Sequence, residues 1–505
     1  MPLSQHSTIL ATEDATVLYG QTEPTRAVVI GGSMAGLMAA RVLSDHFEQV
    51  IVLDKDELPL TAQPRRGAPQ SIHTHGLLSR GANAMEALFP GFKQSLIDQG
   101  GLRINMQANF PIYSEGKPLA HGQSETEGVG ASRLCIEAEL RRRVRAIDNV
   151  LVFPNQDITQ PRYDEDLKAV TGVEFYPRAL QGNLDPDLRN LTLSIPNNCF
   201  YLRADLVVDA TGRGSQSPKW LSNWGFKTPT EERVRVGIAY ITAYFKRDPH
   251  NPMLDGSWPS PINGVLSTAS PAVPRPGVML AQEPDVDGNY RWVISFGGYE
   301  DDQPEPNHES FIACAKQVGS HAMLKVVQQC EQLGEIHRYQ FPYNMRRHYE
   351  KLRNFPARYL VMGDALASFN PIYGQGMTVA ASEAQLLQQL LAQSEKQLWQ
   401  PFFKAAAKLI DTPWQMAVGA DLAIPSVAEQ EKAPLSVKII NRYMARLFQA
   451  AHHNSDLSRA FIYVMHMLKP PTSLFAPKVL WRVWRKMPRT NEIAVTPKTM
   501  PEGAV

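Results

Sequence analysis

The fold is decided by residues 26–54, which read RAVVIGGSMAGLMAARVLSDHFEQVIVLD. Residues 27–30 form a continuous apolar run, typical of a parallel strand that is covered on both faces. A glycine-rich turn follows at residues 31–36, apolar residues then recur at helical spacing, and a second apolar run at residues 50–53 ends in Asp54. The order of strand, glycine turn, helix, strand and acid predicts a Rossmann-like unit that binds a dinucleotide.

Each small or acidic residue of this stretch has a physical role if a dinucleotide is bound. Gly31 makes the tight turn, Gly36 lets the helix pack closely on the strand, and backbone N–H groups at the helix start face the pyrophosphate. Asp54 lies where a carboxylate accepts hydrogen bonds from the ribose hydroxyls. Ser33 replaces the middle glycine of G-x-G-x-x-G, and serine is small enough to allow close approach of a phosphate.

Length and composition limit the class of protein. The chain has 505 residues, of which 43% are hydrophobic, and a net charge of +1, so we expect roughly two to three domains with large cores. Acidic and basic residues are intermixed, which excludes a nucleic-acid footprint, and the basic run at residues 141–145 is interpreted as a solvated helix face. The four cysteines are scattered without a C-x-x-C pair, which is typical of a reducing compartment.

The N-terminal 25 residues are polar and acidic, whereas a signal peptide is basic and then apolar. No apolar run approaches the ~18 residues that span a membrane. We therefore expect a cytoplasmic protein that is peripherally membrane-associated at most.

The parallel-strand pattern returns twice later in the chain. Apolar runs at residues 205–210 and 358–362 are followed by Gly212 and Gly363. Between them, residues 217–350 are rich in proline and in alternating segments, which predicts a largely antiparallel sheet. Three further runs are interpreted as strands of a meander, at residues 150–153, 170–175 and 191–195.

These patterns predict an α/β (α+β) fold in which a Rossmann-like domain is interrupted by a mostly antiparallel sheet domain and followed by a helical region. The predicted boundaries are a flexible lead-in at 1–25, a discontinuous nucleotide-binding domain at 26–66, 127–216 and 352–410, a substrate-binding sheet domain at 67–126 and 217–351, and a C-terminal helical region at 411–505. Because ligands sit beyond the carboxyl ends of parallel strands, one extended cofactor could touch Gly31, Gly212 and Gly363.

In its sequence motifs the chain resembles an FAD-dependent monooxygenase of the p-hydroxybenzoate hydroxylase-like superfamily. It is most similar to the branch that contains bacterial polyether polyene epoxidases, with squalene epoxidase more distant. The similarity covers roughly residues 26–420. It is carried by VVIGGSMAGL at 28–37 with Asp54, RRGAPQ at 65–70 with HTHGLL at 73–78, Ser132-Arg133, DATGRGS at 209–215, GIAY at 237–240, GDA at 363–365 and FNPIYGQGM at 369–377.

The resemblance implies an FAD site. Its pyrophosphate part would be held by Gly31, Ser33, Met34, Ala35 and Gly36, and its adenosine ribose by Asp54 beside Lys55. Arg133 would lie along the pyrophosphate or ribityl chain near Gly212, and Asp364 would hydrogen-bond a ribityl hydroxyl. The flavin ring would be flanked by Arg65 and by the turn that contains Pro371, Gly374, Gln375, Gly376 and Met377, whose backbone N–H groups would stabilise negative charge on the reduced flavin.

The implied chemistry is oxygen transfer from O₂ through a C4a-hydroperoxyflavin to a hydrophobic secondary metabolite, by epoxidation or hydroxylation. Such a reaction needs a shielded apolar pocket rather than a catalytic triad, and the sequence shows no triad. The residues proposed to line this pocket are Tyr240, Tyr244, Trp292 and Phe296, which could equally be ordinary core aromatics.

Two departures from the superfamily pattern affect the interpretation. Many of its hydroxylases carry an Asp-Gly pair linked to NADPH where this chain has Ala210-Thr211-Gly212, so the electrons would come from NAD(P)H directly or through a separate flavin reductase. The halogenase signature W-x-W-x-I-P is missing, which argues against halogenation. His73 and His75 have an H-x-H spacing, but we interpret them as contacts of the loop beside the flavin rather than as metal ligands.

The segment 473–487 alternates apolar and basic residues. Such a helix could lie on a membrane surface and collect a lipophilic substrate, or it could dock over the substrate domain.

Two alternatives to the oxygenase remain open. One is a flavin-dependent dehydrogenase or reductase of a lipophilic, prenyl-type substrate, and the other is a flavoprotein whose FAD is structural and which binds a partner.

Overall fold

The computed structural model describes residues 24–178, 184–255, 258–393 and 397–485. Its first sheet is five-stranded and entirely parallel, in the order β18-β12-β1-β2-β7. The strands are β1 (Arg26–Ile30), β2 (Gln49–Leu53), β7 (Val150–Phe153), β12 (Leu206–Asp209) and β18 (Tyr359–Val361). All five are largely buried, as their continuous apolar sequences predicted. The predicted α/β class is confirmed.

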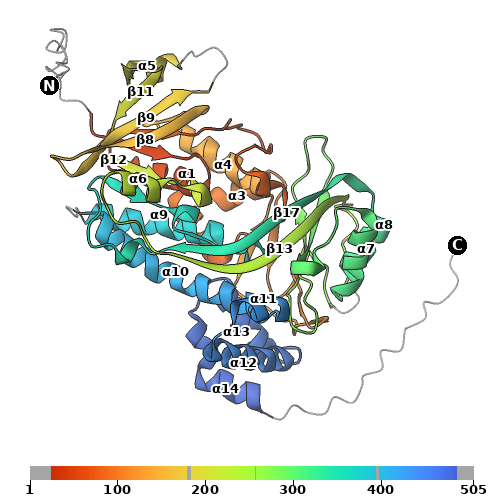
Figure 1. Ribbon diagram of the computed structural model, residues 1–505. Coiled ribbons are helices and arrows are strands. Elements are labelled where there is room, and N and C mark those ends of the chain that lie inside the picture. The colour runs from red at the N-terminus through yellow and green to blue at the C-terminus, as the bar shows by residue number, and fades with distance from the viewer. Residues whose placement is uncertain (1–23, 179–183, 256–257, 394–396, 486–505) are drawn as a thin grey trace, which may run out of the picture.

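Helices pack around this sheet to form one large core, which we call the parallel-sheet domain (Figure 1). These helices are α1 (Met34–Leu43), α2 (Ser79–Leu88), α3 (Phe92–Asp98), α4 (Arg133–Arg145), α6 (Ser217–Asn223), α9 (Gly376–Ala392) and α10 (Trp399–Asp421). Ser132 caps the N-terminus of helix α4, because its Oγ accepts a 3.0 Å hydrogen bond from the Cys135 N–H.

A four-stranded antiparallel sheet in the order β10-β11-β9-β8 lies at one end of this domain (Figure 1). It contains β8 (Gln156–Asp164), β9 (Ala169–Pro177), β10 (Leu193–Ile195) and β11 (Cys199–Arg203), with the short helix α5 (Pro186–Asn190) between β9 and β10. The meander predicted from residue 150 therefore begins one strand later. Residues 150–153 instead form β7, which pairs in parallel with β2.

The second large sheet has eight strands in the order β19-β17-β13-β16-β15-β14-β4-β5. Strands β13 (Glu231–Lys246) and β17 (Gln332–Arg347) cross from the parallel-sheet domain to α7 (His308–Gln317) and α8 (His321–Gln329) (Figure 1). The shorter strands are β4 (Ile112–Ser114), β5 (Lys117–Pro118), β14 (Gly264–Ser267), β15 (Gly277–Gln282), β16 (Arg291–Tyr299) and β19 (Ala367–Ser368), with β3 (Leu102–Asn105) and β6 (Glu127–Gly130) forming a separate pair.

The observed cores correct two of the predicted domain boundaries. Helices α2 and α3 lie in the segment assigned to the sheet domain, but Ala82, Met85 and Phe92 are buried in the core of the parallel-sheet domain. The predicted boundary at residue 411 also falls inside α10, which continues through Pro413 to Asp421. Both errors arose because apolar helical spacing reveals a helix but not the sheet on which it packs.

The C-terminal elements form a small helical group, which we call the helical cap (residues 425–484). It contains α11 (Pro425–Glu431), α12 (Leu435–Ala451), α13 (Ser455–Met465), α14 (Pro477–Trp484) and a 3₁₀ turn at Pro471–Phe475. The inner side of the cap packs against β15 and β16 of the eight-stranded sheet. Within the described residues, none of the helices is both long and apolar enough to span a membrane.

Candidate active site

The carboxyl ends of β1, β12 and β18 lie side by side, because these three strands are neighbours in the parallel sheet. Gly31, Gly212 and Gly363 follow them, and all three have positive φ angles, of 105°, 78° and 67°. Glycine is the residue that adopts this conformation most readily. The prediction that three glycine-bearing strand ends meet at one edge is therefore confirmed.

Gly31 and Gly36, at the two ends of the glycine-rich segment, leave no room for a side chain of their own. A Cβ atom on Gly31 would lie 2.6 Å from the Ala210 carbonyl oxygen, and one on Gly36 would lie 1.8 Å from the Gly31 carbonyl oxygen. The first backbone hydrogen bond of α1 runs from the Leu37 N–H to the Ser33 carbonyl oxygen. The N–H groups of residues 34–36 therefore have no acceptor within the helix. They form a ready anion site at a positive helix end.

Asp54 directly follows β2, and its carboxylate is fixed by the backbone. Its Oδ2 accepts a hydrogen bond from the Gly32 N–H at 2.6 Å, and its Oδ1 accepts one from the Asp56 N–H at 2.8 Å. Burial raises the pKa of Asp54, and the nearby Arg65 opposes that rise. Lys55 is exposed beside it. The role of Asp54 at a ribose stays a prediction.

Sequence reasoning missed the centre of the charged part of the site, which is Glu137 on α4. Its carboxylate pairs with Arg133, Arg65 and Arg141 at 3.0, 2.9 and 2.9 Å. Burial acts to raise the pKa of Glu137, but the three guanidinium groups lower it to about 2. We call these four residues, together with Ser33 and Asp56, the Glu137 cluster.

Ser33 joins this cluster to the glycine turn. Its hydroxyl accepts a 3.0 Å hydrogen bond from Arg133 Nη2 and donates one of 3.2 Å to Glu137 Oε2. Although Ser33 is the N-cap residue of α1, its side chain makes no capping bond. The serine that replaces the middle glycine of the motif therefore connects the anion-binding turn to two charged side chains.

Two arginines named in the sequence analysis belong to the Glu137 cluster. Arg65 pairs with Glu137 and with Asp56 (3.1 Å), next to Ser33 and Asp54, and its expected position beside the flavin ring stays a prediction. Arg141 was expected on a solvated face, but it is 2% exposed and donates to the Pro59 carbonyl oxygen. In both cases the guanidinium group pairs with the buried carboxylate of Glu137.

The side chain of Asp364 is exposed, and a Cβ on Gly212 or Gly376 would have only an Asp364 atom within 4 Å; we call this open space beyond the strand ends the hollow. Asp364 is surrounded by protein, and this burial raises its pKa against the opposing effects of Arg133 and Arg213. Its side chain is nevertheless accessible to solvent from the open side. Gly212 and Gly376 border the same space, since a Cβ on either would lie 3.9 and 3.7 Å from Asp364 atoms. An elongated ligand would pass between these residues.

The turn before α9 closes the other end of the hollow. Pro371–Tyr373 form a 3₁₀ turn, Gly374 has φ of 64°, and α9 begins at Gly376. The first backbone hydrogen bond of α9 runs from the Val379 N–H to the Gln375 carbonyl oxygen. The N–H groups of residues 376–378, which include Met377, therefore have no acceptor within the helix and are available to a ligand.

This turn is fastened from below by a buried acid on α10. Asp421 accepts hydrogen bonds from Asn344 Nδ2 at 2.7 Å, from Asn370 Nδ2 at 2.8 Å and from the Tyr373 hydroxyl at 2.8 Å. Burial raises the pKa of Asp421 to about 6. We call these four residues the Asp421 cluster, and sequence reasoning missed it because its members come from distant segments.

A second buried acid supports the strand end after β18. Glu383 on α9 accepts a 2.6 Å hydrogen bond from the Gly363 N–H, while its other oxygen is buried without a hydrogen-bond partner. Burial raises the pKa of Glu383 to about 8. Glu383 is therefore a neutral acid at neutral pH.

Strand register divides the four predicted pocket residues between two faces of the eight-stranded sheet. Tyr240 and Tyr244 alternate with Ile241 and Phe245 along β13, so the tyrosines lie on the opposite face. Trp292 pairs directly with Phe245, and Phe296 with Ile241. Both residues are buried in the core beneath α7 and α8. Trp292 and Phe296 are therefore core residues, and their assignment to the pocket was wrong.

The face with Tyr240 and Tyr244 is covered by the loop that contains His73. The Tyr244 hydroxyl donates to the Ile72 carbonyl oxygen, and His73 Nδ1 lies 2.7 Å from Thr242 Oγ1. Burial lowers the pKa of His73 to about 3, so its imidazole is neutral at ordinary pH. Polar hydroxyl contacts, as well as aromatic rings, therefore occupy this face.

Tyr339 on β17 connects this face to the hollow, and sequence reasoning missed it. Its ring lies 5.4 Å from that of Tyr240 and 5.7 Å from that of His73. Burial raises its pKa, with opposing influence from Arg213 and a further contribution from Asp364. Tyr339 is thus near enough to Asp364 for the charge of that carboxylate to affect the pKa of the tyrosine.

The loop of residues 72–76 also reaches the turn before α9. A Cβ on Gly374 would lie 3.3 Å from the Gly76 carbonyl oxygen. His75 Nδ1 lies 2.9 Å from the His73 carbonyl oxygen, so the two histidines do not form a metal pair with each other through Nδ1. Among the described residues, no group of three or more His, Cys, Asp or Glu side chains could hold a metal ion.

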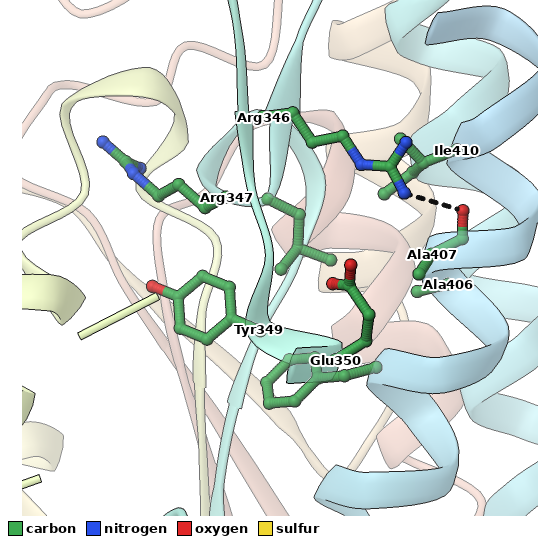
Figure 2. Close-up of a pocket in the computed structure, with 9 residues that line it drawn as sticks. Arg346, Arg347, Tyr349, Glu350, Ala406, Ala407 and Ile410 are labelled. Atoms are coloured by element: carbon green, nitrogen blue, oxygen red, sulfur yellow. Dashed lines mark hydrogen bonds between the residues drawn. The ribbon is translucent and has the colours of Figure 1, made fainter. Parts of the chain in front are cut away.

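Two recesses lie outside this arrangement. One of about 320 Å³ is bordered by Tyr244 and by mostly polar residues, namely Asp285, Asp287, Asn289, Arg291, Leu333 and Gly334. The other, of about 10 Å³, lies between β17 and α10 (Figure 2) and has room for about one water molecule.

Figure 2 shows Arg346 and Arg347 pointing to opposite sides of their strand beside the smaller recess. Arg346 donates to the Ala407 carbonyl oxygen at 3.3 Å and pairs with Asp411 at 2.7 Å, whereas Arg347 donates to the Ala365 carbonyl oxygen at 3.0 Å. The two arginines join β17 to α10 and to the strand end after β18, so this recess belongs to a structural junction.

Comparison with known proteins places the chain in a family. No family model matches it. Protein Rv3254 of Mycobacterium tuberculosis is 33% identical over 409 residues, which cover 79% of this chain and 80% of that protein. The chain belongs to the family of Rv3254.

Solved structures with low sequence identity share the fold. The flavin-dependent brominase Bmp2 is 14% identical with a TM-score of 0.58 (88% of this chain, 94% of Bmp2). A flavoprotein/dehydrogenase from Cytophaga hutchinsonii is 16% identical with a TM-score of 0.58 (88% and 92%). A Photorhabdus luminescens protein described as an FAD-containing monooxygenase is 15% identical with a TM-score of 0.51 (79% and 100%). The chain therefore shares its fold with these flavin-dependent proteins.

The residues present fit an FAD molecule. Gly31 and Gly36 allow close backbone contacts that fix the start of α1 at the ends of β1 and β12, and two helix starts offer free N–H groups. Asp364, Gly212 and Gly376 border a hollow between those two helix starts. The donor set is thus cationic and amide-rich at one end and amide-rich at the other, as a dinucleotide with an electron-accepting ring requires.

Proposed function

We propose that the protein is an FAD-dependent monooxygenase that epoxidises or hydroxylates a hydrophobic substrate. The observation that carries the proposal is the hollow around Asp364, which joins the glycine turn of α1 to the turn of residues 371–376. This arrangement is supported by a fold shared with flavin-dependent enzymes, including one described as a monooxygenase.

In this proposal Gly31, Ser33 and the N–H groups of residues 34–36 hold the pyrophosphate of FAD. Asp54 holds the ribose, Asp364 holds the ribityl chain, and the N–H groups of residues 376–378 face the pyrimidine edge of the ring. When bound, FAD supplies the electrons and the site at which O₂ is activated.

The chain's own contribution at the pyrophosphate end is electrostatic. Three guanidinium groups share one carboxylate in the Glu137 cluster, and Asp56 provides a second carboxylate to Arg65. Arg133 has Ser33 and Glu137 as partners and can turn its remaining N–H groups toward a phosphate. The cluster therefore fixes the position of Arg133 before the cofactor arrives.

At the ring end the chain provides fixed backbone dipoles and excludes water. The Asp421 cluster holds the turn of residues 371–376, so that the amides at the start of α9 keep one orientation. Such preorganised donors stabilise negative charge on a ring without reorganisation. His73, Tyr240 and Tyr339 shield the side of the hollow toward the eight-stranded sheet.

The substrate in this proposal approaches from the sheet face that carries Tyr240 and Tyr244. The opposite face is filled by α7 and α8, so it offers no space. The neutral imidazole of His73 shares a hydrogen bond with Thr242, which in turn lies 2.5 Å from Ser295 Oγ. This chain of exchangeable protons would keep the face polar at one point while its aromatic rings contact an apolar substrate.

The electron donor is part of the proposal. Because residues 210–212 read Ala-Thr-Gly, we expect a separate flavin reductase to deliver the electrons, with NAD(P)H as their ultimate source. Reduction of the isolated holoprotein by NADPH alone, at a rate comparable to that with an added reductase, would contradict this part.

The test of the reaction is the fate of molecular oxygen. Holoprotein reduced anaerobically is mixed with ¹⁸O₂ and a panel of polyenes and aromatic polyketides, and the products are analysed by mass spectrometry. One ¹⁸O atom per product molecule is expected. A product that is oxidised or reduced without ¹⁸O would support the dehydrogenase or reductase alternative, for which the Cytophaga hutchinsonii structure is the relevant neighbour.

A further inference from the structure

The outer surface of the helical cap is unusually apolar. Fourteen large hydrophobic side chains are exposed among the described residues, and seven of them lie between residues 435 and 484. Leu435 is 73% exposed, Trp481 is 62% exposed and Trp484 is 64% exposed. Trp481 and Trp484 are the exposed tryptophans among the described residues. Large rings are normally buried, so a concentration of exposed ones marks an interaction surface.

The structure brings these side chains together from separate segments. Tyr443 on α12 stacks on Phe475 with ring centroids 4.7 Å apart, and its hydroxyl donates to the Leu474 carbonyl oxygen at 2.6 Å. Ile439 lies one helical turn before Tyr443 and therefore on the same side of α12. Figure 1 shows α12 and α14 at the end of the molecule away from the β8–β11 sheet.

The inner side of the same helices is already in use. Leu447 and Ala450 of α12 and Val483 of α14 are buried in one core with Leu280 and Val293 of the eight-stranded sheet. Packing on the protein therefore accounts for one face of each helix. The exposed isoleucine and tryptophan side chains belong to the other face.

Charge is distributed unevenly between the cap and the rest of the chain. The cap, residues 425–484, contains eight Lys or Arg residues and three acids, Glu429, Glu431 and Asp456, whereas the whole chain has 51 basic and 50 acidic residues. The cap therefore carries a net charge of +5 and the remainder −4. Asp456 is itself paired with Arg459 and with Arg482.

The cations lie among the exposed apolar side chains. Lys438 and Arg442 are exposed on α12, and the guanidinium of Arg485 lies over the Trp481 ring, 5.1 Å from its centroid. Apolar side chains that are surrounded by lysine and arginine are typical of surfaces that lie in the headgroup region of an anionic bilayer, where tryptophan is also favoured.

We propose that the outer face of the helical cap docks the protein on an anionic lipid surface. The contact is peripheral, because none of the described helices could span a bilayer. Leu435, Ile439, Phe475, Trp481 and Trp484 enter the headgroup region, and the basic residues of the segment face the lipid phosphates. The proposal does not depend on the reaction proposed above.

The experiment measures binding of the full-length protein to vesicles by flotation. Vesicles of phosphatidylcholine are compared with vesicles in which about one third of the lipid is phosphatidylglycerol. Binding to the anionic vesicles is expected to be about tenfold stronger. The double variant Trp481→Ser/Trp484→Ser and the double variant Lys438→Glu/Arg442→Glu are each expected to weaken it about tenfold.

A matched control removes exposed apolar side chains elsewhere. Leu167 and Leu193 are 59% and 67% exposed, and Leu167→Ser/Leu193→Ser is expected to bind vesicles like the unaltered protein. Equal binding by both double serine variants, or no preference for anionic lipid, would overturn the proposal. So would a dimer in solution that dissociates in Trp481→Ser/Trp484→Ser, because the surface would then bind a second copy of the chain.

Discussion

At one end of the hollow the buried carboxylate of Glu137 is ionised among three arginines, whereas Asp421 at the other end, and Glu383 at the strand end after β18, are held by neutral amide and hydroxyl donors. The pKa of Glu137 is lowered to about 2, and those of Asp421 and Glu383 are raised to about 6 and about 8. Comparable burial is thus accompanied by pKa shifts in opposite directions, because the partners differ in charge.

This contrast matches what each end would hold. A pyrophosphate is a double anion, and the Glu137 cluster presents guanidinium groups whose charge is only partly compensated. The flavin ring is uncharged until it is reduced, and the Asp421 cluster, whose hydrogen-bond donors are neutral, keeps the backbone amides of this turn in place. The charged end should therefore be sensitive to loss of a partner, and the neutral end to pH.

The largest expected effect is at the charged end. Glu137→Gln would leave three buried guanidinium groups without their shared counter-charge, and we expect a loss of about 3–5 kcal/mol in the free energy of unfolding. Urea denaturation measures it. The control is Glu331→Gln, whose exposed pair with Lys246 should contribute less than about 1 kcal/mol. Similar losses in the two variants would break the comparison.

The neutral end should be less sensitive to removal of its acid. Asp421→Leu leaves the donors of Asn344, Asn370 and Tyr373 without an acceptor, and we expect a loss of about 2–4 kcal/mol together with weaker FAD binding. Asp411→Asn on the same helix removes an acid that is half exposed and should change stability by less than about 1 kcal/mol. Unchanged FAD affinity in Asp421→Leu would show that the turn does not need this network.

The pH dependence of stability should reveal Glu383. Its pKa is raised by burial from 4.5 to about 8, so the folded state holds a proton that the unfolded state has lost. Its contribution is complete below about pH 4.5 and is lost as the pH rises through about 8. Between pH 5 and 8 the Tm of the apoprotein should fall about 2–4 °C more than that of Glu383→Gln. Parallel curves would contradict the neutral assignment.

The smallest expected effect is at Ser33. Ser33→Ala removes two hydrogen bonds to residues that remain paired with each other, so we expect a loss of about 0.5–1.5 kcal/mol. The measurement is the same urea titration. A loss as large as that of Glu137→Gln would mean that the serine, and not the carboxylate, organises the charged cluster.

The parallel-sheet domain could be predicted because its signals are local. Strands covered on both faces leave continuous apolar runs such as residues 27–30, and Gly31 and Gly36 are required by close backbone contacts within the same turn. The Ser132 cap of α4 likewise depends on residues only three positions apart. Local patterns of this kind do not require knowledge of the tertiary structure.

The errors came from contacts between distant segments. The face on which Trp292 lies depends on the register of β13 against β16, and a shift of one residue would have reversed it. The Asp421 cluster joins residues from three separate segments and leaves no pattern in any of them. The Glu137 cluster did leave a signal, because Arg133, Glu137 and Arg141 recur every four residues along α4.

The most direct test of the central claim is FAD binding by a protein whose hollow has been filled. A Cβ atom on Gly376 would have only Asp364 Oδ1 near it, at 3.7 Å, and one on Gly419 in α10 would have nothing within 4 Å. Gly376→Leu should therefore fold with an unchanged Tm and bind FAD at least about tenfold more weakly, while Gly419→Leu should bind it like the unaltered protein. Equal FAD affinity in all three proteins would contradict the account.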